Sequence, residues 1–278
     1  MGKRSDIGWL HRRLPDGLIV EGHTFNSWWG CVRRSPGCEN CYAETIAKHY
    51  GHHVWGPHQT TPRRFFGEKH WQEPRRWNRD AQKNGHRESV FCSSMADVFE
   101  DNPLLVEERK KLWPLIEQTP WLNWLLLTKR PENMHTMVPD SWKGGWPDNA
   151  WAMASAETQG WFERRIEDLL AVPAIVHGLS LEPLIGAIDL GPYQFDPRLS
   201  WVIVGGESGP DADRRPLHPA WERRIRLQCQ QGGIAYYFKQ WAGRTHKSGG
   251  NLVEGRIYDD MPPEFPTWVG RSMAHAGN

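Results

Sequence analysis

Three cysteines lie within eleven residues of the chain, at Cys31, Cys38 and Cys41, and only two of its five cysteines occur elsewhere. Thiolates this close in sequence act as disulfide partners, as zinc ligands or as ligands to an iron–sulfur cluster. Internal disulfide pairing would leave one of three thiols over, and three is one fewer than a closed four-ligand metal site needs. A metal held by three protein ligands keeps one position open for chemistry. The spacing therefore favours a catalytic metal centre over a structural one.

The cysteines leave the kind of metal open. A zinc ion would need a fourth protein ligand, and histidines that follow the cysteines could supply it. These are His49, His52, His53 and His58. An iron–sulfur cluster needs no further protein ligand if a substrate or cofactor takes the fourth iron. Cys38 and Cys41 alone form a C-x2-C pair, so Cys31 is what makes a three-ligand site plausible.

Composition and charge describe a folded chain of 278 residues with 38% hydrophobic residues and a net charge of +1. No apolar run approaches the roughly 20 residues that a membrane-spanning helix needs. The segment Met1–Asp6 lacks the apolar core of a secretory signal. We therefore expect a cytoplasmic protein with no membrane partner, and a reducing cytosol disfavours disulfides.

Arginine pairs lie beside aromatic residues in two segments, 63–66 and 71–77. Such rings and guanidinium groups can stack on bases and hold phosphates, although a net charge of +1 gives no overall attraction to nucleic acid. The alternative, which we favour, is that the 17 tryptophans fill the core while the arginines solvate helix faces.

Short apolar runs recur from about residue 88 onward, and their continuous apolar character suits strands buried on both faces of a parallel sheet. The runs are Val90–Cys92, Trp124–Leu127, Trp151–Ala154, Ala174–Val176, Trp201–Val204 and Ala235–Phe238. They start roughly 23 to 34 residues apart, the length of a strand-plus-helix unit. Helices are expected between them, over 105–118, 161–171 and 219–231.

A polar or glycine-rich cluster follows nearly every one of these strands. The clusters are Ser93–Asp97, Thr128–Arg130, Ser155–Thr158, Ser180–Pro183, Gly205–Gly209 and Lys239–Trp241. In a parallel barrel the carboxyl ends of the strands meet at one face, where active sites form. The cysteines directly follow a first strand expected over 24–29, with a helix after them over 44–50, so the metal site should lie at the same mouth.

The pattern predicts an α/β protein with a TIM-barrel-like (β/α) barrel, complete or partial. We expect a single domain over residues 1–278. An Arg- and Trp-rich insertion is expected over about 51–87, and an irregular, Gly- and Pro-rich extension over about 243–278.

Three cysteines after the first strand of a barrel, the last followed by Tyr42, resemble those of radical S-adenosylmethionine (SAM) enzymes. More closely, the chain resembles a phage-protein family named for phage gene products 37 and 68, a domain of unknown function related to spore photoproduct lyase-like proteins. The matching segments are Thr24–Cys31, Ser35–Glu44, Leu127–Glu132, Leu179–Leu184, Val202–Gly209 and Phe238–Trp241. Radical SAM enzymes usually carry C-x3-C-x2-C, whereas the first gap here is six residues.

The resemblance implies that Cys31, Cys38 and Cys41 each bind one iron of a [4Fe–4S] cluster. The fourth iron would take the amino and carboxylate groups of SAM, and one electron from the cluster would yield methionine and a 5′-deoxyadenosyl radical. That radical would remove a hydrogen atom from the substrate. The resemblance thus implies an enzyme of lyase or transferase type, with the reaction left open. The implied partners are an electron donor such as flavodoxin or ferredoxin, a nucleic-acid or nucleobase substrate, and a partner protein.

The resemblance also assigns roles to the strand-end residues. Those expected to bind the cofactor are Ser93, Ser94, Asp97, Ser155, Glu157, Gly205, Gly206 and Glu207. The first three lie where that superfamily often holds the methionine amino group. The next two are expected to hydrogen-bond ribose hydroxyls, and the glycine pair lets the backbone approach the adenosine closely.

The residues expected to contact the substrate are Lys129, Arg130, Glu182 and Lys239. The alternative is that Arg130–Glu182 and Lys239–Glu207 are ion pairs that brace the barrel mouth. Two other functions stay open: a zinc-stabilised nucleic-acid-binding protein without catalysis, and a metal-free hydrolase that uses Glu182, Glu207 and Lys239. The other two cysteines, Cys92 and Cys229, lie in an apolar strand and on an apolar helix face, and they are expected to act as small hydrophobic residues.

Overall fold

The computed structural model describes residues 4–210 and 212–262, and its centre is a seven-stranded sheet. The strand order is β11-β10-β9-β8-β7-β6-β3, and all neighbouring strands run parallel. The strands are β3 (His23–Phe25), β6 (Glu88–Cys92), β7 (Leu122–Thr128), β8 (Ala150–Ser155), β9 (His177–Leu181), β10 (Leu199–Gly205) and β11 (Ala235–Gln240). Within this sheet each strand pairs with the sheet strand that follows it along the chain.

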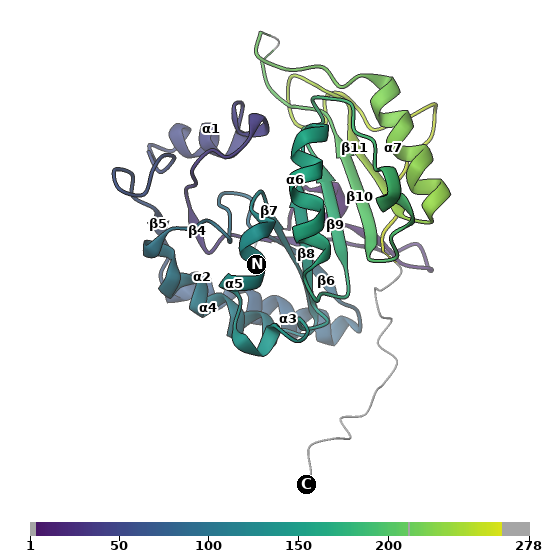
Figure 1. Cartoon of the computed structure of the whole chain (residues 1–278). Coiled ribbons are helices and arrows are strands. Elements are labelled where there is room, and N and C mark those ends of the chain that lie inside the picture. The colour runs from purple at the N-terminus through teal and green to yellow at the C-terminus, as the bar shows by residue number, and fades with distance from the viewer. Residues whose placement is uncertain (1–3, 211, 263–278) are drawn as a thin grey trace.

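Helices connect the strands and cover one face of the sheet (Figure 1). The α-helices are α1 (Tyr42–His49), α2 (Glu68–Trp71), α3 (Glu73–Asn84), α4 (Val106–Glu117), α5 (Met134–Met137), α6 (Gln159–Leu170) and α7 (Pro219–Gly232). Short 3-10 helices are η1 (Gly8–Leu10), η2 (Pro36–Cys38), η3 (Pro103–Leu105), η4 (Pro131–Asn133), η5 (Asp140–Trp142) and η6 (Gly191–Phe195). Two small antiparallel pairs lie outside the main sheet: β1 (Arg12–Arg13) with β2 (Ile19–Val20), and β4 (Trp28–Trp29) with β5 (Arg64–Phe65).

The helices follow from local sequence. In α6 the buried residues Phe162, Ile166 and Leu169 recur at helical spacing and face the sheet, so their burial fixes the helix against β8. In α7 the His218 side chain accepts a hydrogen bond from the backbone N–H of Ala220 at the start. The helix ends at Gly233, whose φ of +69° is a left-handed conformation that glycine adopts without strain.

The inner face of the sheet, opposite the helices, is filled by the N-terminal segment. Trp9 of η1 packs against Phe91 of β6 and Trp201 of β10, with ring centroids 4.9 and 6.3 Å apart. Because η1 contacts both β6 and β11, which lie far apart in the strand order, the sheet must curl around it. Since β3 and β11 form the two edges of the sheet, the barrel is open. The architecture is therefore a mixed α/β fold with a partial (β/α) barrel.

Two predicted strands differ from the structure. The first one, expected over 24–29, is divided, because β3 ends at Phe25 and β4 pairs with β5 outside the main sheet. The run at 174–176 precedes its strand, since β9 begins at His177. The residues of β9 are partly polar or small. At Gly178 a Cβ would stand 2.8 Å from the Met153 side chain, so a larger residue would not fit there. The other apolar runs lie within β6, β7, β8, β10 and β11.

The predicted insertion over 51–87 is not shown as a separate unit. Its second half contains α3, which packs on β6 and β7 and so forms part of the connection from β3 to β6. The described part of the predicted C-terminal extension, 243–262, covers the edge of β11, where the Phe238 N–H donates to the Tyr258 carbonyl at 2.9 Å. Residues 263–278 of that extension lie outside the described residues. No helix among the described residues has the length and apolar character to cross a membrane.

Candidate metal centre and cavity

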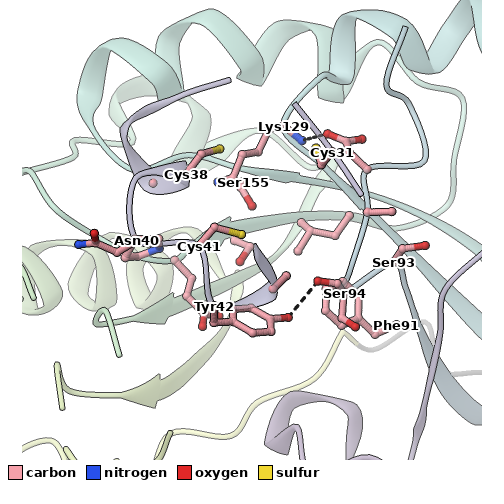
Figure 2. A pocket seen from close by; sticks show the side chains of 18 of the residues that line it. Cys31, Cys38, Asn40, Cys41, Tyr42, Phe91, Ser93, Ser94, Lys129 and Ser155 are labelled. Atoms are coloured by element: carbon pink, nitrogen blue, oxygen red, sulfur yellow. Dashed lines mark hydrogen bonds between the residues drawn. The ribbon is translucent and has the colours of Figure 1, made fainter. Parts of the chain in front are cut away.

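A cavity of about 560 Å³ opens at the carboxyl ends of the parallel strands. Figure 2 shows Cys31, Cys38 and Cys41 around it, together with Ser93, Ser94, Lys129 and Ser155. The predicted site residues that line it are Cys31, Cys38, Cys41, Ser93, Ser94, Asp97, Lys129, Arg130, Ser155, Glu182, Gly206, Glu207 and Lys239. Glu157 and Gly205 are not among the lining residues. The cavity is large enough for a nucleoside-sized ligand.

Each of the three cysteine sulfurs has an N–H donor beside it. The backbone N–H of Arg34 donates to Cys38 Sγ at 3.5 Å, and Arg130 Nη1 lies 3.8 Å from Cys31 Sγ. Cys41 precedes the first turn of α1, where the backbone N–H groups of residues 43 and 44 act on its sulfur. Such donors stabilise thiolate sulfur in metal and iron–sulfur sites.

Burial raises the pKa of the Cys31 and Cys41 thiols above the ordinary value, despite these donors. Both thiols are therefore protonated at neutral pH when nothing binds them, and a bound metal would displace the protons. Among residues 4–210 and 212–262, no three His, Cys, Asp or Glu side chains come close enough to share one metal ion. A cluster that gives each thiolate its own iron does not require such convergence. The described residues therefore hold no preformed three-ligand site for a single zinc ion.

The histidines proposed as a fourth zinc ligand have other surroundings. His52 packs edge-on against Trp29 with ring centroids 5.7 Å apart, and His49 packs against Tyr50. Because the described residues form no three-ligand group, none of these histidines completes a site with the cysteines.

Arg130 and Asp97 anchor the first part of the cysteine loop, residues 31–41. Arg130 Nη1 donates to Asp97 Oδ2 at 2.7 Å, and Arg130 Nη2 donates to the Val32 carbonyl at 2.8 Å. Asp97 also accepts from Thr128 Oγ1 at 2.6 Å and from the Lys129 N–H at 3.1 Å. Burial opposes ionisation of Asp97, but the Arg130 charge and these hydrogen bonds outweigh it and lower its pKa.

Glu157 lies under the middle of the cysteine loop and is completely buried. It accepts hydrogen bonds from Lys129, from Ser35 Oγ at 2.8 Å and from Arg165 Nη1 at 3.3 Å. A Cβ on Gly37 would stand 2.6 Å from the Glu157 side chain, so the loop can approach only with glycine there. Burial works against the charge of Glu157, but the Lys129 and Arg165 cations prevail and lower its pKa.

Glu207 anchors the last part of the loop. It pairs with Arg215 and accepts from Asn40 Nδ2 at 3.1 Å. Arg215 Nη1 continues the network to the Pro36 carbonyl at 3.1 Å and to Glu39 at 2.8 Å. Sequence reasoning missed Arg215 and Asn40 as site residues. Asn40 lies within the matching segment Ser35–Glu44, and Arg215 belongs to the Arg214–Arg215 run, but neither signal indicates a partner.

On the other side of the cavity Lys239 pairs with Glu182, and the Tyr42 hydroxyl donates to the Ser94 carbonyl at 3.2 Å. The predicted pairs Arg130–Glu182 and Lys239–Glu207 were therefore wrong in their partners. Arg130 binds Asp97 instead, and Lys239 binds Glu182. Gly205 packs against the Glu182 and Lys239 side chains, which explains why it does not line the cavity.

The remaining walls are largely apolar. Besides the predicted residues, Ile7, Trp9, Val32, Trp55, Phe91 and Leu127 line the cavity. A mostly apolar lining with a few polar groups suits a ligand that must be oriented and shielded from water.

Comparison with known proteins gives a family and a general likeness. The model of a family described as a protein of unknown function, DUF5131, matches residues 19–262. No curated protein matches the chain. A solved double mutant of spore photoproduct lyase, with bound AdoMet and dinucleoside spore photoproduct, is 12% identical, with a TM-score of 0.44 over 80% of this chain and 64% of that one. A single mutant with the dinucleoside spore photoproduct is also 12% identical, with a TM-score of 0.43 over 73% and 59%. The chain thus spans less than two thirds of either protein.

Proposed function

The chain belongs to the DUF5131 family of unknown function, so we infer its activity from the site, and we propose that it is a radical SAM enzyme. Cys31, Cys38 and Cys41 would hold a [4Fe–4S] cluster, and SAM would occupy the adjoining cavity. One observation carries the proposal: three thiols from one loop line the cavity at the strand ends, each with an N–H donor beside its sulfur. A bound cluster would supply the single electron that cleaves the SAM sulfonium.

The chain itself would bind and orient the cofactor. Ser93 and Ser155 are nearly buried and line the cavity, so their hydroxyls are available to polar groups of SAM. Gly206 also lines it and packs closely on Ala242. Asp97, Glu157 and Glu207 would act indirectly, because their carboxylates are already paired with cations in the network that supports the cysteine loop.

The opposite wall would receive the substrate. Lys239 and Glu182 are partly exposed there and together offer a donor and an acceptor. The rings of Trp9 and Phe91 close the inner end of the cavity and would keep water from reactive species. Lys129 forms an ion pair with Glu157, so we assign it a role in supporting the cysteine loop in preference to substrate contact.

We keep a nucleic acid or nucleobase as the proposed substrate class, with a flavodoxin or ferredoxin as electron donor and a further partner protein. In the Arg63–Phe66 segment, only one of the two arginines has surroundings that support nucleic-acid binding. Arg64 lies over the Trp29 and Phe66 rings, at 4.6 and 5.2 Å from their centroids. Arg63 is instead buried in an ion pair with Glu100 at 2.5 Å, so its charge is already paired.

The test is reductive cleavage of SAM. Protein reconstituted with iron and sulfide under anaerobic conditions would be incubated with SAM and dithionite, and 5′-deoxyadenosine and methionine would be quantified. We expect both products from the wild type and neither from Cys38→Ala. A colourless protein that holds one zinc ion and forms no 5′-deoxyadenosine would favour the zinc-stabilised alternative.

A further inference from the structure

We infer that Arg130 raises the reduction potential of the cluster through Cys31, and that Asp97 limits the size of this effect. The inference rests on the proposed function, since it concerns a cluster bound by the three cysteines. It gives Arg130 a positioning and tuning role in place of the substrate contact expected from sequence.

Arg130 is held by three contacts at once. Its Nη1 lies 2.7 Å from Asp97 Oδ2 and 3.8 Å from Cys31 Sγ, while its Nη2 donates to the Val32 carbonyl at 2.8 Å. The side chain is 7% exposed. A planar guanidinium can satisfy these partners together, whereas a lysine ammonium offers a single point of charge.

Asp97 is fixed just as firmly. Its Oδ1 accepts from Thr128 Oγ1 at 2.6 Å and from the Phe99 N–H at 3.0 Å, and its Oδ2 accepts from the Lys129 N–H at 3.1 Å. The position of the Arg130 charge relative to the Cys31 sulfur is therefore set by the ends of β6 and β7 and does not depend on the loop alone.

A buried positive charge next to a ligand sulfur favours the reduced cluster, which carries one more negative charge. The other cations around the loop have different partners. Lys129 binds Glu157, Arg215 binds Glu207, and Arg34 extends to Glu132 at the surface. Asp97 carries the opposite charge to Arg130, so removing each should move the potential in opposite directions.

The experiment is a redox titration followed by electron paramagnetic resonance, on anaerobically reconstituted wild type, Arg130→Gln, Asp97→Asn and Arg34→Gln. At the wild-type midpoint we expect Arg130→Gln to lower the ratio of reduced to oxidised cluster about tenfold, a shift of about 59 mV for one electron. Asp97→Asn should shift the midpoint upward. Arg34→Gln removes an exposed charge from the same loop and keeps the backbone donor to Cys38, so it should change the ratio less than about threefold, because solvent screens exposed charge.

A cluster-loaded Arg130→Gln with the wild-type midpoint would overturn the inference and leave the proposed function intact. If Arg130→Gln takes up no iron, Asp97→Asn decides, and an unchanged or lowered midpoint there overturns it equally. A wild type that binds no cluster overturns the proposed function, and the inference with it.

Discussion

The inner face of the barrel is built from apolar side chains, whereas its mouth is built from charged ones. The inner face is filled by apolar side chains, with Trp9 packed against Phe91 and Trp201. The mouth is built from three buried carboxylates, each paired with a cation: Asp97, Glu157 and Glu207. Glu157 and Glu207 bond the cysteine loop directly, whereas Asp97 acts through Arg130, which donates to the Val32 carbonyl. Apolar packing is non-directional, whereas ion pairs and hydrogen bonds fix angles and distances. The first therefore gives the scaffold its stability, and the second gives the loop its shape.

The largest expected difference between the two regions is in metal binding. Cys38→Ala removes one proposed cluster ligand and should reduce iron from about four atoms per chain, the content of a [4Fe–4S] cluster, to a small fraction of that, with thermal unfolding little changed. The matched control is Cys229→Ala, which removes a buried thiol from α7 and should keep its iron. Iron analysis and a thermal melt on both variants decide. Equal iron in the two variants would contradict the assignment of Cys38.

Trp9→Ala should have the largest effect on stability. The ring is 2% exposed at the centre of the inner cluster, and truncation of a buried aromatic costs about 3–5 kcal/mol. Phe195→Ala, at a ring that is 66% exposed, should stay within about 0.5 kcal/mol. Urea unfolding measures both. If Trp9→Ala proved as mild as Phe195→Ala, the inner cluster would not be what stabilises the sheet.

Glu157→Gln should act on the loop more than on the whole fold. It removes the charge that Lys129 and Arg165 neutralise beneath the loop, and an unsatisfied buried partner costs about 1–3 kcal/mol. Hydrogen exchange should show faster opening of amides 31–41, while amides in β8 keep their protection. Glu132→Gln breaks an exposed pair with Arg34 and should leave the loop unchanged. Uniform loss of protection across the sheet in Glu157→Gln would argue against a local role.

The smallest effect concerns pH. Burial opposes the charge of Glu157 and Asp97, but their cations win and hold the pKa of each below its unfolded value, which is about 4.3 for Glu and 3.9 for Asp. Their stabilisation is therefore complete above those values and is lost as pH falls through the folded pKa. The difference in loop protection between wild type and Glu157→Gln should shrink below about pH 4. A difference that grows on acidification would have the wrong sign for this mechanism.

Sequence alone predicted what depends on periodicity. The apolar runs located β6, β7, β8, β10 and β11 within a few residues, and the rule that parallel strand ends share one face brought their polar clusters to one cavity. The contacts that the sequence did not predict depend on how neighbouring strands are aligned and on segments far apart in the chain. Lys239 of β11 and Glu182, which follows β9, come from strands on either side of β10. They can form an ion pair across β10 because Gly205 has no side chain between them.

Two further features had no local signal. Trp9 lies in a segment without helical or strand periodicity, so nothing in the sequence marked it as the filling of the inner face. Arg215 lies in the connection before α7, and its bond to the Pro36 carbonyl joins residues far apart in the chain. Such contacts become visible only when the fold brings the segments together.

If the anchored loop holds an iron–sulfur cluster, as we propose, wild-type protein purified without oxygen should contain it. We would measure its iron and acid-labile sulfide content, with visible spectra before and after dithionite. We expect about four irons and four sulfides per chain and a broad charge-transfer band that bleaches on reduction. A colourless protein with one zinc ion, even after anaerobic reconstitution, would contradict it.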